Sequence, residues 1–462
     1  WTDGSCYFRD RLIHRFSMPH SADERFYPMY NIQQQYIERY LVEAAGENAD
    51  LIDLRWLSSV IDVAQDDDGA RLEVSTPAGV YSLRAEYVLV ADGARSLVRR
   101  KMDLRLNGDN LPGHYVIADV RMNHNFPTQR RSFFESSANP DATLLIHRQP
   151  DNIWRVDWQI ADSDDPDMAI REDTIRRKVS DILEMIGHTG PWDLEWWSMY
   201  TANTLCLDDY RHGRALFMGD AAHIVPIFGV RGLNNGIADA ANAAWKLACR
   251  LTGLATDRLL DSYTVERRGA TLDVFRNAGK SSRFMTPPTR GYGLMRRAVL
   301  ELALSQDFVR PFADPRQVQP WLYDDSLLTC PDELEFVGGP RPGAPLQNIK
   351  LRDDDYLLDH LGYHFSLLYF PAHDDRDAAA HTLAHQLTDR IPTLQFLVIG
   401  GSGKSLPGRH IADPERRAAK AYSAGPGSAY LVRPDRYVVA RWQRPEKEAV
   451  AAALRAALGD AA

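Results

Sequence analysis

The sequence predicts a mixed α/β (α+β) fold divided among several domains. Three observations predict it: alternation typical of antiparallel strands over residues 50–90, a strand–loop–helix unit over residues 215–253, and a return to strands after residue 346. The chain has 462 residues, enough for about three domains. Its 44% content of hydrophobic residues suits a well-buried globular protein.

The first predicted elements are a helix, a set of strands and a tight turn. Apolar residues recur at helical spacing over residues 31–45 (NIQQQYIERYLVEAA) and predict the helix. Alternating residues over 50–90 predict antiparallel strands with a turn at the sequence PAG. The last strand, YVLVA, is expected to be buried and to end in a tight Asp92-Gly93 turn. Ser96 is expected to cap the helix that follows.

A second sheet is predicted between residues 113 and 205. The segments HYVIADVRM, TLLIHR and IWRVDWQIA alternate as strands do, and the region is rich in tryptophan. A largely helical stretch follows over residues 259–309. The Pro/Gly cluster VGGPRPGAPL, residues 337–346, is the best domain boundary. After it come the strands HFSLLYF and TLQFLVIG, a hairpin that turns at Pro434-Asp435, and a final helix, EKEAVAAALRAALGD.

The strand–loop–helix unit carries the strongest functional signal. Its strand, Ala215–Met218, leads to Asp220, and open α/β sheets place ligand contacts at the carboxyl ends of their strands. Gly229 and Gly232 in the loop lack side chains, so a planar ligand can approach the backbone closely. The amino end of the next helix points at this loop, and its free N–H groups favour partial negative charge there. A plain turn with structural glycines is the alternative on pattern alone.

The helix of this unit is expected from Ile237 onwards and is stopped by Gly253. Its apolar residues follow one helical face, as in an amphipathic helix. These residues are Ile237, Ala241, Ala244, Trp245, Ala248 and Leu251.

Composition argues against several classes of function. The net charge of −9, with interspersed signs, argues against nucleic acid as a partner. No apolar run approaches the roughly 18 residues of a membrane span, so we expect a soluble chain with no membrane partner. The four cysteines are far apart and form no CxxC, which fits a reducing cytoplasm and excludes a zinc site built of cysteines alone.

Two further patterns fail as functional motifs. FLVIGGSGKS resembles a phosphate-binding P-loop, but Val398 stands where the first glycine is required, so we do not expect nucleotide hydrolysis. Metal binding has little support, because His212 and His223 are eleven residues apart across a strand. His360 and His364 would align only on a helix, which the glycine between them disfavours. We therefore expect no metal site.

The stretch GDAAHIVPIFGVRGLNNGIADAANAAWKLA, residues 219–248, resembles the second flavin-binding signature of the class A, single-component flavoprotein aromatic hydroxylases. This is the p-hydroxybenzoate hydroxylase and phenol hydroxylase group, whose signature reads much like GDAAHxxPPxGxxGxNxGxxDxxNLxWKL. The chain departs from it at Ile227 and Ala244, and neither position carries a ligand side chain. The resemblance implies that Asp220 binds the ribityl chain of FAD and that the Pro226 backbone lies beside the reactive part of the isoalloxazine.

The same resemblance implies a full set of cofactor contacts in this stretch. Backbone groups of Leu233 and Asn234 would meet the pyrimidine edge of the flavin. The implied cofactor-binding residues are Gly219, Asp220, Pro226, Gly229, Gly232, Leu233 and Asn234.

Two shorter motifs support the resemblance. ADGARSLVRR is similar to the family's DGxxSxxR motif, which is associated with the pyrophosphates of FAD and NAD(P)H, and Asp92, Gly93, Ser96 and Arg99 fill its fixed positions. NIQQQYIERYL resembles the family's QxxLE helix, with Gln34 at the flavin-contacting position. Taken alone, the first motif is equally a solvated basic turn and the second an ordinary amphipathic helix.

The resemblance also implies the domain plan. GGPRPGAPL and YLVRPDRYVVARW resemble the thioredoxin-like tail of the phenol hydroxylase and hydroxyphenylpropionate hydroxylase-like branch, a tail linked to assembly and hence to a possible homodimer. The tail has no CxxC, so we assign it no redox chemistry. The expected domains are a partial FAD-binding, Rossmann-like domain (1–112), a β-sheet substrate domain (113–205), a second part of the FAD-binding domain (206–336) and the thioredoxin-like domain (337–462).

One expected motif has no counterpart. Members of the family open with a strand, a GxGxxG turn and a helix, and these 462 residues contain no such segment. We therefore hypothesise a fragment of a longer enzyme. The alternative is a truncated, flavin-free homologue that acts as a non-enzymatic interaction protein.

The resemblance implies an FAD-dependent monooxygenase that hydroxylates a small aromatic, phenolic substrate with NAD(P)H and O2. In that family hydride reduces the flavin, oxygen adds at its C4a, and the terminal oxygen passes to an electron-rich ring. The tryptophan-rich strands resemble in placement the sheet that covers the substrate, and His147, Trp154 and Trp158 are the substrate candidates. No catalytic residue is identified, and the group that would bind or deprotonate the ring hydroxyl is left open.

Overall fold

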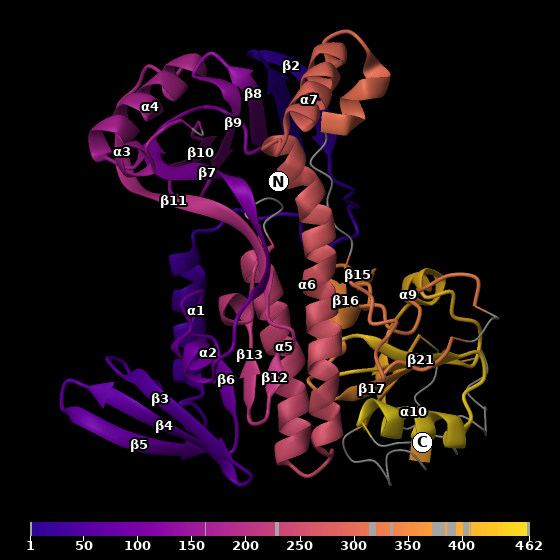
Figure 1. The fold of residues 1–462 in the computed structure, drawn as a ribbon. Helices are drawn as coiled ribbons and strands as arrows, with labels where there is room; N and C mark the ends of the chain where they lie inside the picture. Colours follow the sequence, from indigo (N-terminus) through magenta and orange to yellow (C-terminus); the bar gives the residue numbers. More distant parts are fainter. Residues whose placement is uncertain are drawn as a thin grey trace.

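The computed structural model describes residues 2–161, 163–226, 231–313, 320–332, 336–371, 384–385, 394–400, 406 and 408–459. A large sheet with its helices forms one end of the molecule (Figure 1). A small sheet of three short strands lies in the middle, beside two long helices (Figure 1). A second, C-terminal sheet packs against the side of those helices (Figure 1). The mixed α/β fold predicted from the sequence is confirmed.

The large sheet has eight strands and contains the second sheet that the sequence predicted. All neighbouring strands are antiparallel except β1 and β8, which are parallel. The order is β14 (His223–Ile224), β11 (Trp192–Cys206), β7 (Asn107–Met122), β10 (Ile153–Gln159), β9 (Asn139–Arg148), β8 (Arg130–Ser136), β1 (Asp3–Phe8) and β2 (Arg11–Ser17).

The extent of this sheet differs from the predicted domain plan. Strands β1 and β2, which the plan placed in domain 1–112, complete the large sheet, because β1 pairs in register with β8. Helix α7 (Arg290–Ala303), predicted within 206–336, also packs on this sheet through Leu300 and Ala303. The reason is long-range strand pairing, which a linear division of the sequence does not contain.

The two faces of the large sheet have different coverings. On the outer face, apolar side chains of β7, β9 and β10 pack against helix α4 (Glu172–Met185) and form a core with Ile175, Val179 and Ile182. The short helix α3 (Pro166–Ala169) precedes α4. On the inner face, a smaller core is covered by α7, by the 3-10 helix η2 (Asp307–Ala313) and by the end of α6. The rest of the inner face carries mainly polar residues, among them Asp119, Arg155 and Asp157.

The middle of the molecule holds a three-stranded sheet in the order β12 (Arg211–His212), β13 (Ala215–Phe217) and β6 (Val88–Val90). Strands β13 and β6 are parallel, with Ala215 opposite Val88 and Phe217 opposite Val90. Around them lie α1 (Gln34–Glu47), α2 (Leu97–Lys101), α5 (Gly232–Leu251) and α6 (Asp257–Met285). The predicted helices at residues 31–45 and within 259–309 are thus confirmed, whereas Leu89 of the predicted buried strand is 43% exposed.

A separate antiparallel sheet contains β3 (Ser59–Asp66), β4 (Gly69–Thr76) and β5 (Gly79–Ala85). The predicted turn joins β4 to β5 as expected. The predicted strand before Ser59 is wrong, because residues 51–58 form turns and irregular structure.

Helix α5 buries a different face from the one an amphipathic reading would give. Ile237 is 50% and Leu251 47% exposed, and of the predicted apolar face only Trp245 is buried. The buried residues are mainly polar because they find charged and hydrogen-bonding partners on α6 and in the C-terminal sheet. They are Asn235, Asp239, Asn242, Ala243, Trp245 and Lys246.

The C-terminal sheet has the order β19 (Arg409–Ile411), β18 (Leu394–Ile399), β17 (Phe365–Phe370), β20 (Ser428–Val432) and β21 (Val438–Trp442). Strands β17, β18 and β19 are parallel, while β20 and β21 form the predicted antiparallel hairpin. The remaining elements here are β15 (Lys350–Arg352), β16 (Asp355–Tyr356), η3 (Leu357–His360), α9 (Arg417–Ala421) and α10 (Lys447–Ala457). The likeness of this region to thioredoxin stays a prediction.

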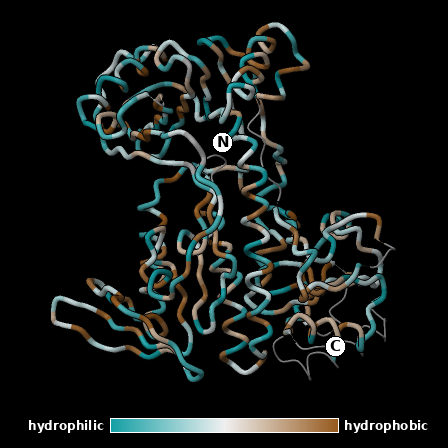
Figure 2. Tube along the Cα trace, in the orientation of Figure 1, coloured by the Kyte–Doolittle hydropathy of each residue, from teal (hydrophilic) through white to brown (hydrophobic). Residues whose placement is uncertain are grey.

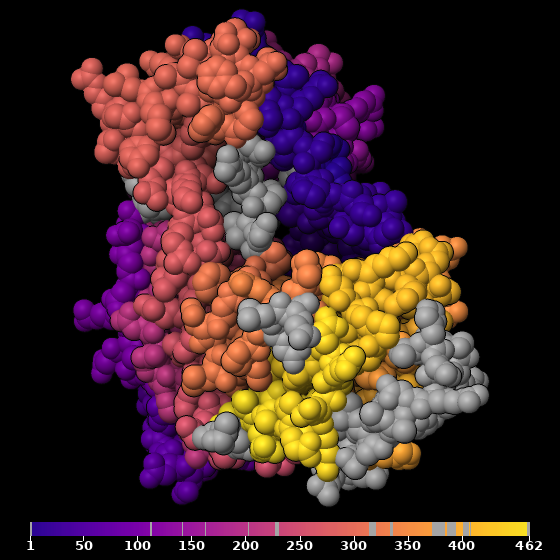
Figure 3. Space-filling model, turned by 90° about the vertical axis from the view of Figure 1, so that its right-hand side faces the viewer, coloured from indigo at the N-terminus to yellow at the C-terminus, as the bar shows by residue number. Residues whose placement is uncertain are grey.

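The C-terminal region contacts two distant parts of the chain. Trp245 of α5 and Leu259 of α6 belong to the same core as β17, β20 and α10. In the space-filling view the N-terminal residues (indigo) lie next to the C-terminal ones (yellow), where Arg417 forms an ion pair with Asp23 at 2.9 Å (Figure 3).

Hydropathy along the helices shows no membrane-spanning pattern in the part of the chain that the structure describes. Brown and teal stretches intersperse along the long helices (Figure 2). Within the described ranges, no helix combines the length and apolarity that a bilayer crossing requires.

Candidate functional site

Two turns that lie far apart in the sequence meet at one edge of the central sheet. The Asp92-Gly93 turn follows β6, and the Gly219-Asp220 turn follows its parallel neighbour β13. The Met218 N–H donates to the Val90 carbonyl at 3.0 Å, which keeps the two strand ends level. Both glycines have positive φ, 79° and 55°. The carboxyl ends of two parallel strands thus form one edge, the place where α/β sheets bind ligands.

The first turn is held by its own side chains. The Asp92 carboxylate accepts hydrogen bonds from the N–H groups of Leu97 and Val98, at 2.8 and 3.1 Å. Ser96 Oγ accepts from the Arg99 N–H at 3.0 Å, so the predicted cap is confirmed. The first turn therefore presents the start of α2 in a fixed position.

Arg99 links the two turns. Its side chain is buried, and the guanidinium donates to the Ala221 carbonyl at 2.9 Å and to the Ala94 carbonyl at 2.6 Å. Ala221 lies 122 residues further along the chain. In this structure Arg99 therefore ties the DG turn to the GD turn, a role that the sequence did not predict. Its predicted contact with a pyrophosphate stays a prediction.

The second turn depends on two glycines in close approach. A Cβ added to Gly236 of α5 would lie 3.3 Å from the Cα of Gly219, so α5 crosses the turn without intervening side chains. The Gly219 N–H donates to the Asp239 carboxylate at 3.0 Å. Asp220, the next residue, is exposed. Its carboxylate is available to accept hydrogen bonds from a ligand.

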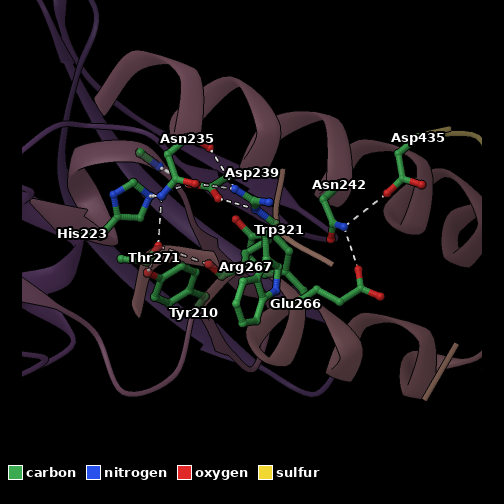
Figure 4. A network of polar contacts seen from close by, with 12 residues as sticks. Tyr210, His223, Asn235, Asp239, Asn242, Glu266, Arg267, Thr271, Trp321 and Asp435 are labelled. Atoms are coloured by element: carbon green, nitrogen blue, oxygen red, sulfur yellow. Dashed lines mark hydrogen bonds and ion pairs between the residues drawn. The ribbon is translucent and has the colours of Figure 1, made fainter. Parts of the chain in front are cut away.

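A buried polar network supports this turn from below (Figure 4). Asp239 is fully buried and accepts from His223 Nε2 and from Arg267 Nε, both at 2.7 Å. Arg267 also donates to Asn235 Oδ1 at 2.6 Å. Burial alone would raise the pKa of Asp239, but the bonds to His223 and Arg267 outweigh it and hold this pKa below its ordinary value. Asp239 is therefore an ionised acceptor that fixes the turn through Gly219.

A second buried cluster joins this network to the C-terminal region. Glu266 of α6 accepts from Arg433 at 2.6 and 2.9 Å and from Lys246 at 2.7 Å. Asn242 donates to Glu266 and also to Asp435 in the β20–β21 turn (Figure 4). Burial lowers the pKa of Lys246 to about 8, whereas Arg433 and Lys246 overcome burial and keep the pKa of Glu266 far below its ordinary value. Helices α5 and α6 are thus clamped to the C-terminal hairpin.

The amino end of α5 lies beside the second turn. The helix begins at Gly232, five residues before the predicted start, and its cap residue Arg231 makes no side-chain capping bond. The first N–H groups of an α-helix lie beyond its internal hydrogen bonds, and the helix dipole favours negative charge at this point. Leu233 is 48% exposed. Pro226 is buried just before this end, and Gly229 lies outside the described residues.

The inner face of the large sheet reaches this site through Tyr200. Tyr200 of β11 donates its hydroxyl to the Val225 carbonyl at 2.7 Å, and in the sheet it stands opposite Tyr115 of β7. Burial and the negative charge of Asp220 raise the pKa of Tyr200 to about 12, so it stays a neutral donor. Sequence reasoning missed Tyr200 because its role depends on the strand register.

The strand register separates the three substrate candidates. His147 of β9 pairs with Arg155 of β10, so it lies on the inner face. Trp154 and Trp158 alternate with Arg155 on β10 and lie on the outer face, where they are 1% and 3% exposed in the core against α4. The two tryptophan candidates thus pack in the outer core, whereas His147 lies on the opposite, inner face, and its contact with a substrate stays a prediction.

Gln34 is the first residue of α1, and its exposed side chain donates to Glu38 at 2.7 Å. Its predicted contact with a flavin stays a prediction. In the described ranges, no group of three or more His, Cys, Asp or Glu side chains is placed to hold a metal ion.

Comparison with known proteins decides the family. The model of the family described as "FAD binding domain" matches residues 12–278, more than half of the chain. The chain belongs to this FAD-binding family. The exposed Asp220 carboxylate, the uncapped amino end of α5 and the side-chain-free crossing at Gly219 fit the polar and planar parts of FAD.

Relatives of this FAD-binding protein include named hydroxylases. It is 26% identical over 393 residues to a 3-(3-hydroxy-phenyl)propionate/3-hydroxycinnamic acid hydroxylase of Shigella sonnei, covering 82% of this chain and 68% of that one. It is 30% identical over 289 residues to the Mycolicibacterium smegmatis protein of the same name, covering 62% of this chain and 49% of that one.

Solved structures share the fold. The flavin-dependent monooxygenase PieE, in complex with FAD and substrate, aligns with a TM-score of 0.75 at 22% identity over 99% of this chain and 86% of that one. Aklavinone-11 hydroxylase, with FAD and aklavinone, aligns with a TM-score of 0.72 at 21% identity over 99% and 85%.

Proposed function

We propose that this chain acts in an FAD-dependent monooxygenase that uses NAD(P)H and O2 to hydroxylate a small aromatic, phenolic substrate. One observation carries the proposal: the two turns after β6 and β13, the amino end of α5 and the inner face of the large sheet converge on one site. The names of the relatives, which are hydroxylases of phenolic acids, support the same reaction class.

Each part of the site has a task in this proposal. FAD, when bound, supplies the acceptor for hydride from NAD(P)H and the activation of oxygen. Asp220 accepts hydrogen bonds from the ribityl hydroxyls. The amino end of α5 stabilises negative charge at the pyrimidine edge of the flavin. Tyr200 holds the Val225 carbonyl and so fixes the loop that leads to Pro226.

The large sheet shields the reacting ring. A phenolic ring would lie between the loop at Val225–Pro226 and the inner face of the sheet, where Ile117, Ser198 and Tyr200 are partly exposed. Exclusion of water from this space protects the reaction until oxygen has been transferred. We further propose that the C-terminal sheet is the thioredoxin-like part and pairs two copies of the chain.

The first test is the flavin content of the purified chain. We expect flavin absorption bands and close to one equivalent of FAD released on heating, or uptake of added FAD. Asp220→Ala should weaken FAD binding by about 10- to 100-fold, because a charged hydrogen-bond acceptor is lost. Asp193→Ala, at an exposed acid on β11, is the matched control and should leave FAD binding unchanged.

The second test is turnover. Phenols should stimulate NAD(P)H oxidation, and one atom of 18O2 should appear in the ring product by mass spectrometry. A colourless chain that takes up no FAD would overturn the enzyme proposal for these residues and favour the flavin-free interaction protein.

A further inference from the structure

The inner face of the large sheet carries an acid that the proposed reaction has not yet used. Asp157 lies on β10, opposite Ile117 of β7 and Leu145 of β9, and Ile117 in turn stands opposite Ser198 of β11. These residues form one row across the inner face. The next row contains Tyr115 and Tyr200, which reaches the Val225 carbonyl.

Asp157 is buried and holds an unused acceptor. It is 4% exposed, and its Oδ1 has no hydrogen-bond partner among the described residues. Its neighbour Asp119, on the same face, is fully engaged, because Arg155 donates to both its oxygens at 2.8 Å. Leaving a buried acceptor unpaired is unfavourable. In a native protein such an atom calls for an explanation, and a catalytic role or a bound water or ligand is one.

The partly exposed residues beside Asp157 suit contact with a small ring. Ile117 and Ser198 are partly exposed, and Ile117 of β7 separates Asp157 from β11, the strand that carries Ser198 and Tyr200. Two strand spacings span about 10 Å. A ring lying over Ile117 would therefore extend from Asp157 toward β11, whose Tyr200 contacts the Val225 carbonyl. The partly exposed side chain of Ile117 offers apolar surface to the ring, and Asp157 is the polar group at its end.

We propose that Asp157 binds the hydroxyl group of the phenolic substrate and accepts its proton. This inference rests on the proposed function. The phenol O–H donates to Asp157 Oδ1. On proton transfer the phenol O–H bond breaks, an O–H bond forms on the carboxylate, and the ring is left as a phenolate. The phenolate is the more electron-rich ring, which oxygen transfer requires.

The surroundings of Asp157 suit this exchange. The charged or titratable groups that face it are Asp119 of β7, Arg130 of β8, His147 of β9 and Arg155 of β10. Burial raises the pKa of Asp157 to about 7, against the opposing effect of Arg155 and Arg130. Burial and the two arginines lower the pKa of His147 to about 3, so His147 stays neutral. A base with a pKa near the working pH is the most effective.

The test compares two ligands and two variants. The probes are 3-(3-hydroxyphenyl)propionate and its methyl ether, titrated calorimetrically into the FAD-loaded chain. Asp157→Asn should weaken binding of the phenol by about 10- to 100-fold, the usual cost of a charged hydrogen bond, and leave the ether unchanged. Asp193→Asn is the control and should alter neither. Equal effects of Asp157→Asn on both ligands, or none on either, would overturn the assignment.

The pH dependence of the unmodified chain is a second measurement that needs no variant. Asp157 is neutral below pH about 7, so affinity for the phenol should fall as the pH drops through this value while affinity for the ether stays flat. A flat profile for both ligands contradicts the inference. The two proposals fail in different ways. If the chain hydroxylates phenols but Asp157→Asn does not change its affinity for the phenol, only this assignment is overturned. If the chain binds neither FAD nor phenol, both proposals are overturned.

Discussion

Replacing Arg433 with methionine should detach the C-terminal hairpin from helices α5 and α6. Arg433 is 2% exposed and donates to both oxygens of Glu266, at 2.6 and 2.9 Å, and to both of Asp435, at 2.9 and 2.6 Å. The guanidinium also lies 5.1 Å from the ring centre of Trp245 and 5.0 Å from that of Tyr323. Methionine keeps an unbranched apolar stem between these rings and removes only the charge and its donors.

The expected magnitude follows from what Glu266 keeps. Breaking a buried ion pair by removing one partner costs about 3–5 kcal/mol. Glu266 retains the Lys246 ammonium at 2.7 Å and the Asn242 amide at 2.7 Å. We therefore expect the lower end, about 3 kcal/mol. Glu266→Gln should cost a similar amount, and the double variant should cost at least about 1 kcal/mol less than the sum, because both changes remove one shared interaction.

The assay is hydrogen–deuterium exchange followed by mass spectrometry, read on peptides from β20, β21 and α6. A loss of 3 kcal/mol should speed exchange there by about 100-fold, since each 1.4 kcal/mol is a factor of ten. The control is Arg341→Met, because the Arg341–Asp324 pair is as short, at 2.6 Å, but half-exposed. That variant should cost less than about 1 kcal/mol. An Arg433→Met effect no larger than the control, or strictly additive single effects, refutes the argument.

Four further outcomes follow from the site and its supports. Asp239→Asn should weaken FAD binding at least about 10-fold, measured by fluorescence titration, because the Gly219 turn loses its charged acceptor. Gly236→Ala should destabilise the fold by about 1–3 kcal/mol in urea unfolding, because the added Cβ meets backbone at 3.3 Å. Tyr200→Phe should cost about 1 kcal/mol by the same method through the lost bond to the loop. Burial raises the pKa of Asp157 from 3.8 to about 7 in the folded chain. Between these two pH values the unfolded chain has lost this proton while the folded chain still holds it, so the free energy of unfolding falls by roughly 4 kcal/mol as the pH rises. Asp157→Asn should remove that fall, and an unchanged pH profile of the urea midpoint would contradict it.

Local features of this protein followed from the sequence alone. The strand ends at the Asp92 and Gly219 turns, the Ser96 cap, the stop at Gly253 and the hairpin turn at Pro434 were all predicted, and the structure has them. These features depend on neighbouring residues: a side chain that reaches a nearby N–H, a glycine that adopts positive φ, or a proline that fixes a turn. The signature around Gly219 likewise predicted the FAD-binding family.

Only the tertiary structure decided which side of each strand or helix is buried and which faces the candidate site. The sequence contains the alternation of Arg155 and Asp157 with the tryptophans of β10. Which of these two sets lies on the inner face of the large sheet depends on how β7, β9, β10 and β11 pair. Helix α5 buries its polar face because Arg267 and Glu266, on a different helix, supply the charges that make burial favourable. Arg99 ties the two turns together by donating to the Ala221 carbonyl, 122 residues further along the chain. Contacts of this kind join distant segments, so no local pattern records them.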